Sequence, residues 1–163
     1  MKGTFIVNNR KELWDFPPDD RLLSTLRRYG YTEVKNGCQE GECGACLILL
    51  EDSLINSCQV LTASADGKRI TTVKGMGDLH HPHVIQKAFV ETGAVQCGFC
   101  TPGFIIASYA LLKENPNPSI AEIKNGLDGN LCRCTGYVKI IEAVRLAADS
   151  LRTNQHSTHG SEQ

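Results

Sequence analysis

The chain has 163 residues, which is the size of one domain or of two small ones. Its 17 basic and 18 acidic side chains give a net charge of −1, so no strong positive field attracts a nucleic acid or an anionic membrane surface. The longest apolar run, Ala45–Leu50, is far shorter than the roughly 20 residues of a membrane-spanning helix, and the first residues lack the apolar core of a signal peptide. We therefore expect a cytoplasmic protein that binds neither nucleic acid nor membrane.

Cysteine is the unusual part of the composition. Eight cysteines in 163 residues are several times the ordinary usage, yet they fall below the roughly 8 to 10% that is typical of a disulfide scaffold. No secretory signal accompanies them, and thiols in a reducing compartment usually bind metals or perform redox chemistry. The cysteine content therefore indicates metal or redox centres.

The first half of the chain is expected to form short strands around one helix. Asn8 and Asn9 suit a tight hairpin turn because asparagine tolerates positive φ. Either Asp19 or Asp20 is expected to cap a helix with leucines at helical spacing, which ends at Gly30. The expected strands are Thr4–Val7, Glu12–Phe16, Leu47–Leu50, Leu54–Val60 and Arg69–Val73.

Apolar residues at helical spacing replace this pattern after about Asp78. Ser119 and Glu122 have the spacing of a capping box, and Thr101 and Thr135 are expected to cap the helices that follow two cysteine pairs. Four amphipathic helices are typical of a small bundle. The expected helices are Pro82–Thr92, Pro102–Glu114, a third that begins after Ser119, and Tyr137–Leu151.

Two glycines, Gly75 and Gly77, mark the expected boundary between the halves. The predicted domains are therefore residues 1–76 and 77–152. The polar composition of residues 153–163 predicts a disordered tail.

The first four cysteines have the spacing of a plant-type [2Fe-2S] site. Cys38, Cys43 and Cys46 form a C-x4-C-x2-C run, and Cys58 follows after eleven intervening residues. Glycines between them allow backbone N–H groups to turn toward the sulfurs of an anionic cluster. The alternatives are buried structural thiols and a tetrahedral zinc site, although zinc motifs usually show two close cysteine pairs.

The last four cysteines form two close pairs. Cys97 and Cys100 make a C-x2-C pair, and Cys132 and Cys134 make a C-x-C pair after 31 intervening residues. This spacing is compatible with an iron–sulfur cluster, a zinc site or a dithiol redox motif. Each pair immediately precedes a predicted helix, and two helix N-termini would stabilise an anionic cluster.

Three segments resemble the small iron–sulfur subunit of the xanthine dehydrogenase and aldehyde oxidoreductase family of molybdenum hydroxylases. These segments are GCQEGECGAC at 37–46, QCGFCTPG at 96–103 and GNLCRCTGY at 129–137, and the similarity extends over roughly residues 3–151. The resemblance implies an α+β chain, in which an N-terminal β-grasp ferredoxin-like domain is followed by an all-α four-helix bundle. Each domain would hold one [2Fe-2S] cluster.

The resemblance also implies site residues, cofactors and partners. All eight cysteines would be cluster ligands, Gln96 would bond the pterin of the molybdenum cofactor, and the sulfur of Cys134 would approach that pterin. The implied partners are a large subunit that binds molybdopterin and a medium subunit that binds FAD, in a heterotrimer whose dimerisation is left open.

We therefore expect an electron-transfer subunit of a molybdopterin-dependent hydroxylase. Electrons would pass from the molybdenum cofactor through the bundle cluster and then the ferredoxin-like cluster to a flavin or another acceptor, and this chain would carry no substrate-transforming site. A purine such as xanthine is the first expectation for the substrate, followed by other N-heterocycles and aldehydes. The alternative functions are a free-standing two-cluster ferredoxin and a zinc-stabilised interaction domain.

Overall fold

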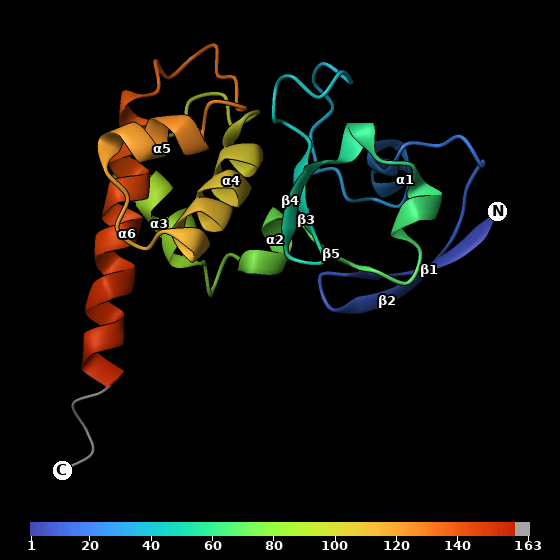
Figure 1. Ribbon diagram of the computed structural model, residues 1–163, viewed down its shortest axis with the longest axis horizontal. Helices are drawn as coiled ribbons and strands as arrows, with labels where there is room; N and C mark the ends of the chain where they lie inside the picture. Colours follow the sequence, from blue (N-terminus) through green and yellow to red (C-terminus); the bar gives the residue numbers. More distant parts are fainter. Residues whose placement is uncertain (159–163) are drawn as a thin grey trace.

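A computed structural model describes residues 1–158 and places a sheet-based half beside a helical half (Figure 1). The fold is the predicted α+β arrangement, with the strands confined to the first half. Within the described residues the strands are β1 (Lys2–Val7), β2 (Arg10–Asp15), β3 (Leu47–Leu50), β4 (Ser53–Asn56) and β5 (Arg69–Thr71).

The strands form one sheet with the order β2-β1-β5-β3-β4. Strands β1 and β5 run parallel, while the other neighbouring pairs are antiparallel. The predicted hairpin turn is confirmed, because Asn8 and Asn9 have φ values of 49° and 65°. This sheet, with helix α1 (Leu22–Arg28) inserted between its two hairpins, is the β-grasp arrangement.

The sheet and α1 enclose their own apolar core. Trp14 is fully buried and stacks on Phe5, with ring centroids 4.5 Å apart. Leu26 from α1 and Ile48 from β3 belong to the same cluster and are also fully buried. Burial of such side chains removes apolar surface from water, which stabilises the packing of α1 against the sheet.

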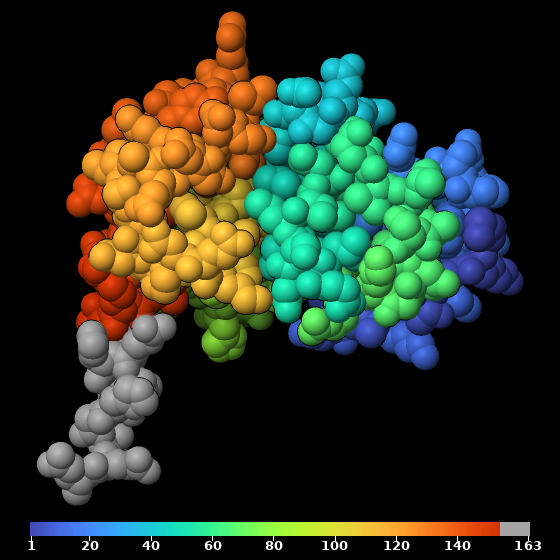
Figure 2. All heavy atoms as spheres, in the orientation of Figure 1, coloured from blue at the N-terminus to red at the C-terminus, as the bar shows by residue number. Residues whose placement is uncertain are grey.

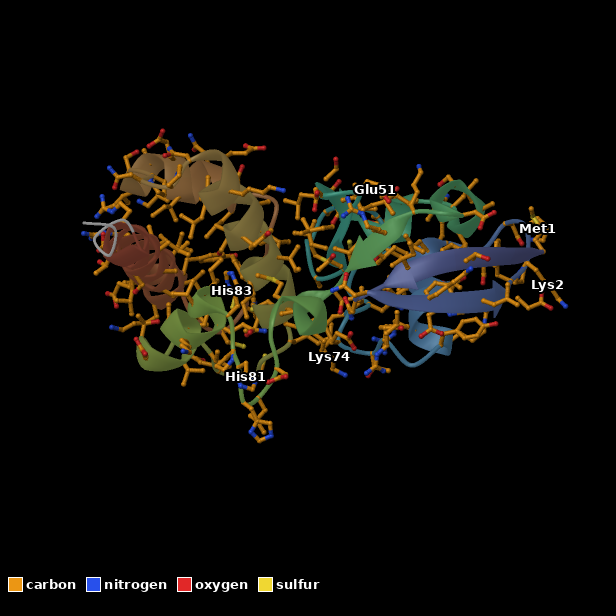
Figure 3. The ribbon with its side chains drawn as sticks, turned by 90° about the horizontal axis from the view of Figure 1, so that it is seen from below. Met1, Lys2, Glu51, Lys74, His81 and His83 are labelled. Carbon is orange, nitrogen blue, oxygen red and sulfur yellow. The ribbon has the colours of Figure 1, made fainter. Side chains whose placement is uncertain are left out.

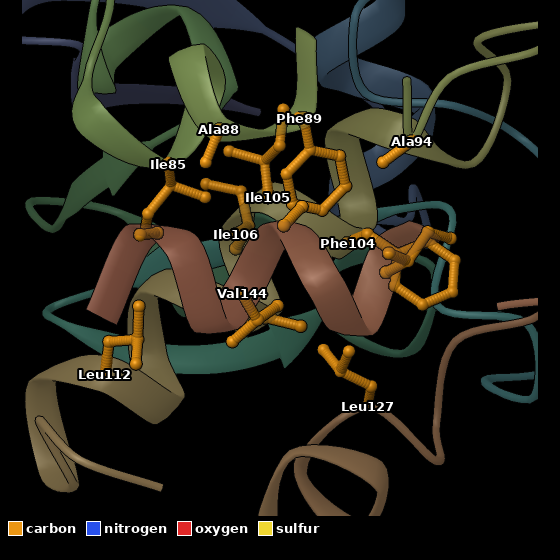
Figure 4. Close-up of a cluster of buried hydrophobic side chains, with 14 of the residues drawn as sticks. Ile85, Ala88, Phe89, Ala94, Phe104, Ile105, Ile106, Leu112, Leu127 and Val144 are labelled. Carbon is orange, nitrogen blue, oxygen red and sulfur yellow. The ribbon is translucent and has the colours of Figure 1, made fainter. Parts of the chain in front are cut away.

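The second half has a core of its own, built from helices. Ile85, Phe89, Ile106 and Val144 are almost completely buried, and they project toward one another from three helices (Figure 4). Within the described residues the helices of this half are α2 (Val73–Met76), α3 (Val84–Glu91), α4 (Thr101–Glu114), α5 (Ile120–Gly126) and α6 (Val138–Thr158).

The two halves are joined by packing and by polar contacts. Leu47 and Leu49 point from β3 into the helical core, so strand β3 contributes to both cores. Glu33, which is 8% exposed, accepts a hydrogen bond of 2.8 Å from Thr72 Oγ1, and Lys74 Nζ lies 3.3 Å from its Oε2. Lys74 lies on α2 where the halves meet (Figure 3). The space-filling view shows the halves in contact along their boundary (Figure 2).

The expected cap of α1 is wrong. Arg21 occupies the N-cap position and makes no side-chain capping hydrogen bond. Asp20 instead accepts a hydrogen bond from Thr25 Oγ1 and forms an ion pair of 2.7 Å with Arg28. The acidic side chain therefore binds groups within the helix, so it does not bond the free N–H groups at its start.

Helix starts also differ around the later cysteine pairs. Cys100 is the N-cap of α4, so Thr101 lies inside the helix. Helix α6 begins at Val138, three residues after Thr135, because Gly136 and Tyr137 adopt positive φ values of 64° and 68°. The capping box of Ser119 and Glu122 is confirmed.

Several element boundaries differ from the sequence expectations. Strand β4 ends at Asn56, and a 3₁₀ turn at Ser57–Gln59 replaces the rest of the expected strand. Helix α3 begins at Val84, because His83 Nδ1 accepts a hydrogen bond from the N–H of Ile85. The loop before α3, which carries His81, projects from the molecule (Figure 3).

Helix α6 continues to Thr158, beyond the start of the tail that composition predicts to be disordered. Residues 153–158 contain neither glycine nor proline, so no strong helix breaker interrupts this stretch. The rest of the expected tail, residues 159–163, lies outside the described residues.

The shared core predicts that Leu49→Ala destabilises the chain more than Leu54→Ala does. These leucines face each other across β3 and β4, but Leu49 is 3% exposed while Leu54 is 38% exposed. We expect Leu49→Ala to cost about 2–5 kcal/mol and Leu54→Ala about 1 kcal/mol or less in chemical denaturation. Equal losses would show that the packing of β3 against the helices contributes little.

Candidate metal centres

The first three cysteines lie in one loop, and the fourth lies on a short turn after β4. Cys38, Cys43 and Cys46 come from the segment between α1 and β3, whereas Cys58 lies in the 3₁₀ turn Ser57–Gln59. Cys46 and Cys58 are 2% and 3% exposed. The sheet therefore holds one side of this site, and the loop closes over it.

The loop adopts conformations that favour glycine. Gly41 and Gly44 have φ values of 84° and 66°. At Gly37, a Cβ atom would lie 2.6 Å from Cys43 Sγ, which is too close for any other residue. Glycine is thus favoured at Gly41 and Gly44 by the positive φ values and at Gly37 by the close approach of the backbone to sulfur.

Hydrogen-bond donors point at the sulfurs of this site. The N–H groups of Cys38 and Glu40 donate to Cys43 Sγ (3.4 Å) and Cys38 Sγ (3.3 Å). Gln59 Nε2 donates to Cys58 Sγ at 3.4 Å. Such donors favour the charged thiolate, which is the form that binds metal.

The first four thiols contact one another as two pairs. The hydrogen bond from Glu40 is the main reason that the pKa of Cys38 falls to about 7, and a contact with the Cys43 thiol adds to this effect. The pKa of Cys46 rises to about 11, mainly because of burial and in part because of the adjoining Cys58 thiol. Cys38 therefore pairs with Cys43, and Cys46 pairs with Cys58.

The second four cysteines also meet as pairs, although they come from segments far apart in sequence. Cys134 Sγ lies 3.7 Å from Cys97 Sγ. The pKa of Cys100 rises to about 12, mainly because of burial and in part because of the adjacent Cys132 thiol. The structure thus brings together the C-x2-C and C-x-C pairs in front of α4 and α6. All four cysteines line one cavity of about 580 Å³, together with Phe99, Leu131, Arg133 and Tyr137.

Thr135 and Tyr137 organise this second site. Burial acts to raise the pKa of Cys132, but hydrogen bonds from the hydroxyl and N–H of Thr135 outweigh it, and the pKa falls to about 7. Tyr137 Oη accepts a hydrogen bond of 2.9 Å from the N–H of Cys132. A bulky residue at positive φ is strained, and such strain is typical of functional sites. The sequence motif containing both residues was visible, but their contacts with the cysteine pair could not be deduced from spacing.

The paired arrangement suits a centre with two metal ions better than a centre with one. For a metal–sulfur bond of about 2.3 Å, two thiolates on one tetrahedral ion lie about 3.8 Å apart. The Cys97–Cys134 sulfur separation of 3.7 Å matches that edge. Among residues 1–158, no three or more His, Cys, Asp or Glu side chains converge on a position for one metal ion.

The two sites touch through the backbone. The N–H of Leu131 donates to the carbonyl of Cys43 at 3.0 Å, and Leu131 directly precedes Cys132. In the space-filling view, the loop near residue 40 adjoins the segment near residue 130 (Figure 2). This backbone hydrogen bond therefore links a cysteine of the first site to the residue that precedes a cysteine of the second.

Part of the second site lies at the surface. Cys97, Cys134 and Gln96 are all exposed, in contrast to the buried Cys46 and Cys58 of the first site. Gln96 directly precedes Cys97 in the chain. The pterin contact expected for Gln96 and Cys134 stays a prediction.

Two family models match consecutive parts of the chain. The "2Fe-2S iron-sulfur cluster binding domain" matches residues 5–70, and the "[2Fe-2S] binding domain" matches residues 72–145. The nicotinate dehydrogenase small FeS subunit of Eubacterium barkeri is 48% identical over 133 residues, covering 81% of this chain and 85% of the relative. The xanthine dehydrogenase iron-sulfur-binding subunit of Escherichia coli O157:H7 is 49% identical over 132 residues, covering 78% and 81%.

The chain belongs to the small [2Fe-2S] subunit family of the molybdenum hydroxylases. A crystal structure of quinoline 2-oxidoreductase from Pseudomonas putida 86 shares the fold, with a TM-score of 0.89 and 36% identity over 94% of this chain and 96% of that chain. In other relatives the matching region is part of a much longer polypeptide, of which this chain covers 11% or 17%. Members of this family are thus oxidoreductase components that occur either as separate small subunits or within fused chains.

None of the helices within residues 1–158 is both long and apolar enough to cross a bilayer.

The contacts of Thr135 predict that Cys132 reacts as a thiolate near neutral pH in folded, metal-free protein. At pH 8, iodoacetamide should modify Cys132 faster than Cys100, because their pKa values are about 7 and about 12. Thr135→Val should move the midpoint of the Cys132 pH profile upward, as measured by mass spectrometry of peptides.

Thr101→Val is the matched control, because Thr101 donates no hydrogen bond to a sulfur among the described residues. A Cys132 midpoint near pH 9 in the folded parent would contradict the assignment. An unchanged midpoint in Thr135→Val would contradict it as well.

Proposed function

We propose that this chain transfers electrons between a molybdopterin-binding subunit and a flavin subunit or another acceptor, through two [2Fe-2S] clusters. Each cluster would be held by four cysteines, one set in the domain of residues 1–76 and the other in the domain of residues 77–152. The observation that carries the proposal is the meeting of each cysteine quartet as two sulfur pairs. The ligands are Cys38, Cys43, Cys46 and Cys58 in the first domain and Cys97, Cys100, Cys132 and Cys134 in the second.

The donor set of each site fits such a cluster. A [2Fe-2S] cluster uses four thiolates, two on each iron, and its potential depends on hydrogen bonds to sulfur and on exposure to solvent. Glu40 N–H and Gln59 Nε2 donate to sulfurs of the first quartet, and Thr135 donates twice to Cys132. These donors offset negative charge at the sulfurs. When bound, the clusters would supply one-electron redox chemistry.

The proposed order of the centres is based on their exposure. Cys97 and Cys134 are exposed, so the second site is the one that a partner subunit can approach most closely. Gln96 lies at the same surface and would bond the pterin of that partner's cofactor. The backbone link between Leu131 and Cys43 then leads inward to the first site. We place the flavin or other acceptor beyond the first quartet.

The complete enzyme is proposed to be a cytoplasmic heterotrimer of this chain, a molybdopterin subunit and an FAD subunit. Relatives of similar length carry the names of xanthine dehydrogenase and nicotinate dehydrogenase. Both names denote an N-heterocycle, so we propose an N-heterocyclic substrate, with a purine as the first candidate. The substrate pocket would lie on the partner subunit.

Ligand substitutions should remove the centres one at a time. Cys43→Ser should abolish one of two paramagnetic signals of the reduced protein, because it breaks one sulfur pair of the first site. Cys100→Ser should abolish the other signal. Electron paramagnetic resonance of the parent and the two variants measures this. Loss of both signals in either variant would contradict two independently ligated centres.

The direction of electron flow is tested by substrate reduction of the purified complex. Xanthine or nicotinate, added without oxygen, should bleach the visible absorbance of both centres. Gln96→Ala should keep both centres but slow this bleaching about tenfold or more, because it removes a group that positions the cofactor. The exposed Ala121→Gly change on α5 serves as a distant surface control. Parent-like bleaching in Gln96→Ala would refute the pterin contact, and absence of a molybdopterin partner would refute the proposed function.

A further inference from the structure

Asn130 lies where the two cysteine regions come closest. It is 4% exposed, and its Nδ2 donates to the carbonyl of Gly44 at 3.3 Å. The next residue, Leu131, donates its N–H to the carbonyl of Cys43 at 3.0 Å. Two successive carbonyls of the first cysteine loop are therefore bonded to the two residues that directly precede Cys132.

The backbones at this junction are too close for intervening side chains. A Cβ atom on Gly44 would lie 2.5 Å from both Asn130 Nδ2 and the carbonyl oxygen of Gly129. A Cβ atom on Gly103, in the first turn of α4, would lie 2.2 Å from the carbonyl oxygen of Gly44. Gly103 and Asn130 thus both pack closely against Gly44, and a Cβ atom on Gly103 would also lie 3.1 Å from Asn130 Nδ2.

The Gly44 carbonyl connects the two halves of the chain. It accepts the hydrogen bond from Asn130 and another, of 3.3 Å, from the N–H of Leu47 at the start of β3. Because Asn130 is buried, its bond to Gly44 is shielded from competition by water. Among the described residues, one further hydrogen bond joins the first cysteine loop to the segment before Cys132. It is the bond from the N–H of Leu131 to the carbonyl of Cys43.

We infer that Asn130 is a positioning residue that fixes the separation of the two redox centres and thereby the rate of electron transfer between them. The inference rests on the proposed function. In the transfer, one electron lost by the centre of the second quartet is gained by the centre of the first quartet, and no bond of the chain is made or broken. Asn130 contributes by holding the Cys43–Gly44 backbone against the residue that precedes Cys132.

A purely structural role for Asn130 makes a different prediction. The N–H of Asn130 bonds the carbonyl of Leu127, so the residue also helps to end helix α5. If Asn130 only stabilised the folded chain, substitution of its side chain would change thermal stability but would leave the magnetic interaction between the centres unchanged. That interaction depends on their separation, so it distinguishes the two roles.

The test compares Asn130→Asp and Asn130→Ala with the parent, each as the full chain in its purified complex. Asn130→Asp keeps the size of the side chain but replaces the amide donor with a carboxylate that repels the Gly44 carbonyl. Asn125→Asp is the matched control, because Asn125 is exposed on α5 and receives the same charge five residues away. Iron and sulfide contents are measured first, and the fully reduced samples are then studied by electron paramagnetic resonance.

We expect both Asn130 variants to retain their iron, to lose most of the spin–spin interaction between the centres, and to show slower electron equilibration after pulsed reduction. Asn125→Asp should behave as the parent does. Gly103→Ala should reproduce the loss, because its Cβ would displace the Gly44 carbonyl that Asn130 bonds. A stability change without any of these effects would assign Asn130 to folding alone.

Three results would overturn the inference. The first is an unchanged interaction and rate in iron-replete Asn130 variants. The second is loss of iron from every Asn130 variant and from Gly103→Ala, which would make the junction a folding element. The third is a parent that holds both clusters but shows no interaction between them. A parent that holds no iron would instead refute the proposed function.

Discussion

Each candidate centre depends on sulfur atoms that the chain holds in pairs. The Cys97–Cys134 separation of 3.7 Å is the edge expected for two thiolates on one tetrahedral ion, and in the sheet half the Cys58 thiol is close enough to raise the pKa of Cys46. Four thiolates concentrate negative charge, so the surrounding backbone has to present donors to them. Around the first quartet these donors include the N–H groups of Cys38 and Glu40, and around the second they include Thr135.

The fold supplies two different environments for these pairs. In the first quartet, Cys46 and Cys58 lie in the core of the sheet half, whereas the second quartet lies in front of α4 and α6 with two cysteines exposed. Strand β3 also packs into the helical core, and this shared packing holds the two halves against each other. A buried centre and a surface centre at a fixed separation are what a short electron-transfer chain requires, with the exposed end available to a partner.

The sequence predicted the elements that depend on local rules. The Asn8-Asn9 turn, the capping box of Ser119 and the order of the strands and of α1 and α3–α6 follow from turn chemistry and periodicity, and the family resemblance implied the β-grasp and bundle topology. Helix α2 was missed, because Val73 was assigned to the strand before it. The misassigned features depend on tertiary contacts. Asp20 bonds Thr25 and Arg28, so it does not cap α1, and Thr135 bonds Cys132 three residues before α6 begins.

Sequence reasoning missed residues whose side chains donate hydrogen bonds to the cysteine sulfurs. Gln59 belongs to this group because its amide reaches both the sulfur of Cys58 and the carbonyl of Gln39. Spacing motifs predict the ligands but give no information about the side chains that bond the ligand sulfurs. The central claim, that each half holds one binuclear iron–sulfur centre, is tested most directly by counting iron and acid-labile sulfide in anaerobically purified protein. The account predicts about four irons and four sulfides per chain; zinc in place of iron, or about two irons in undamaged protein, would contradict it.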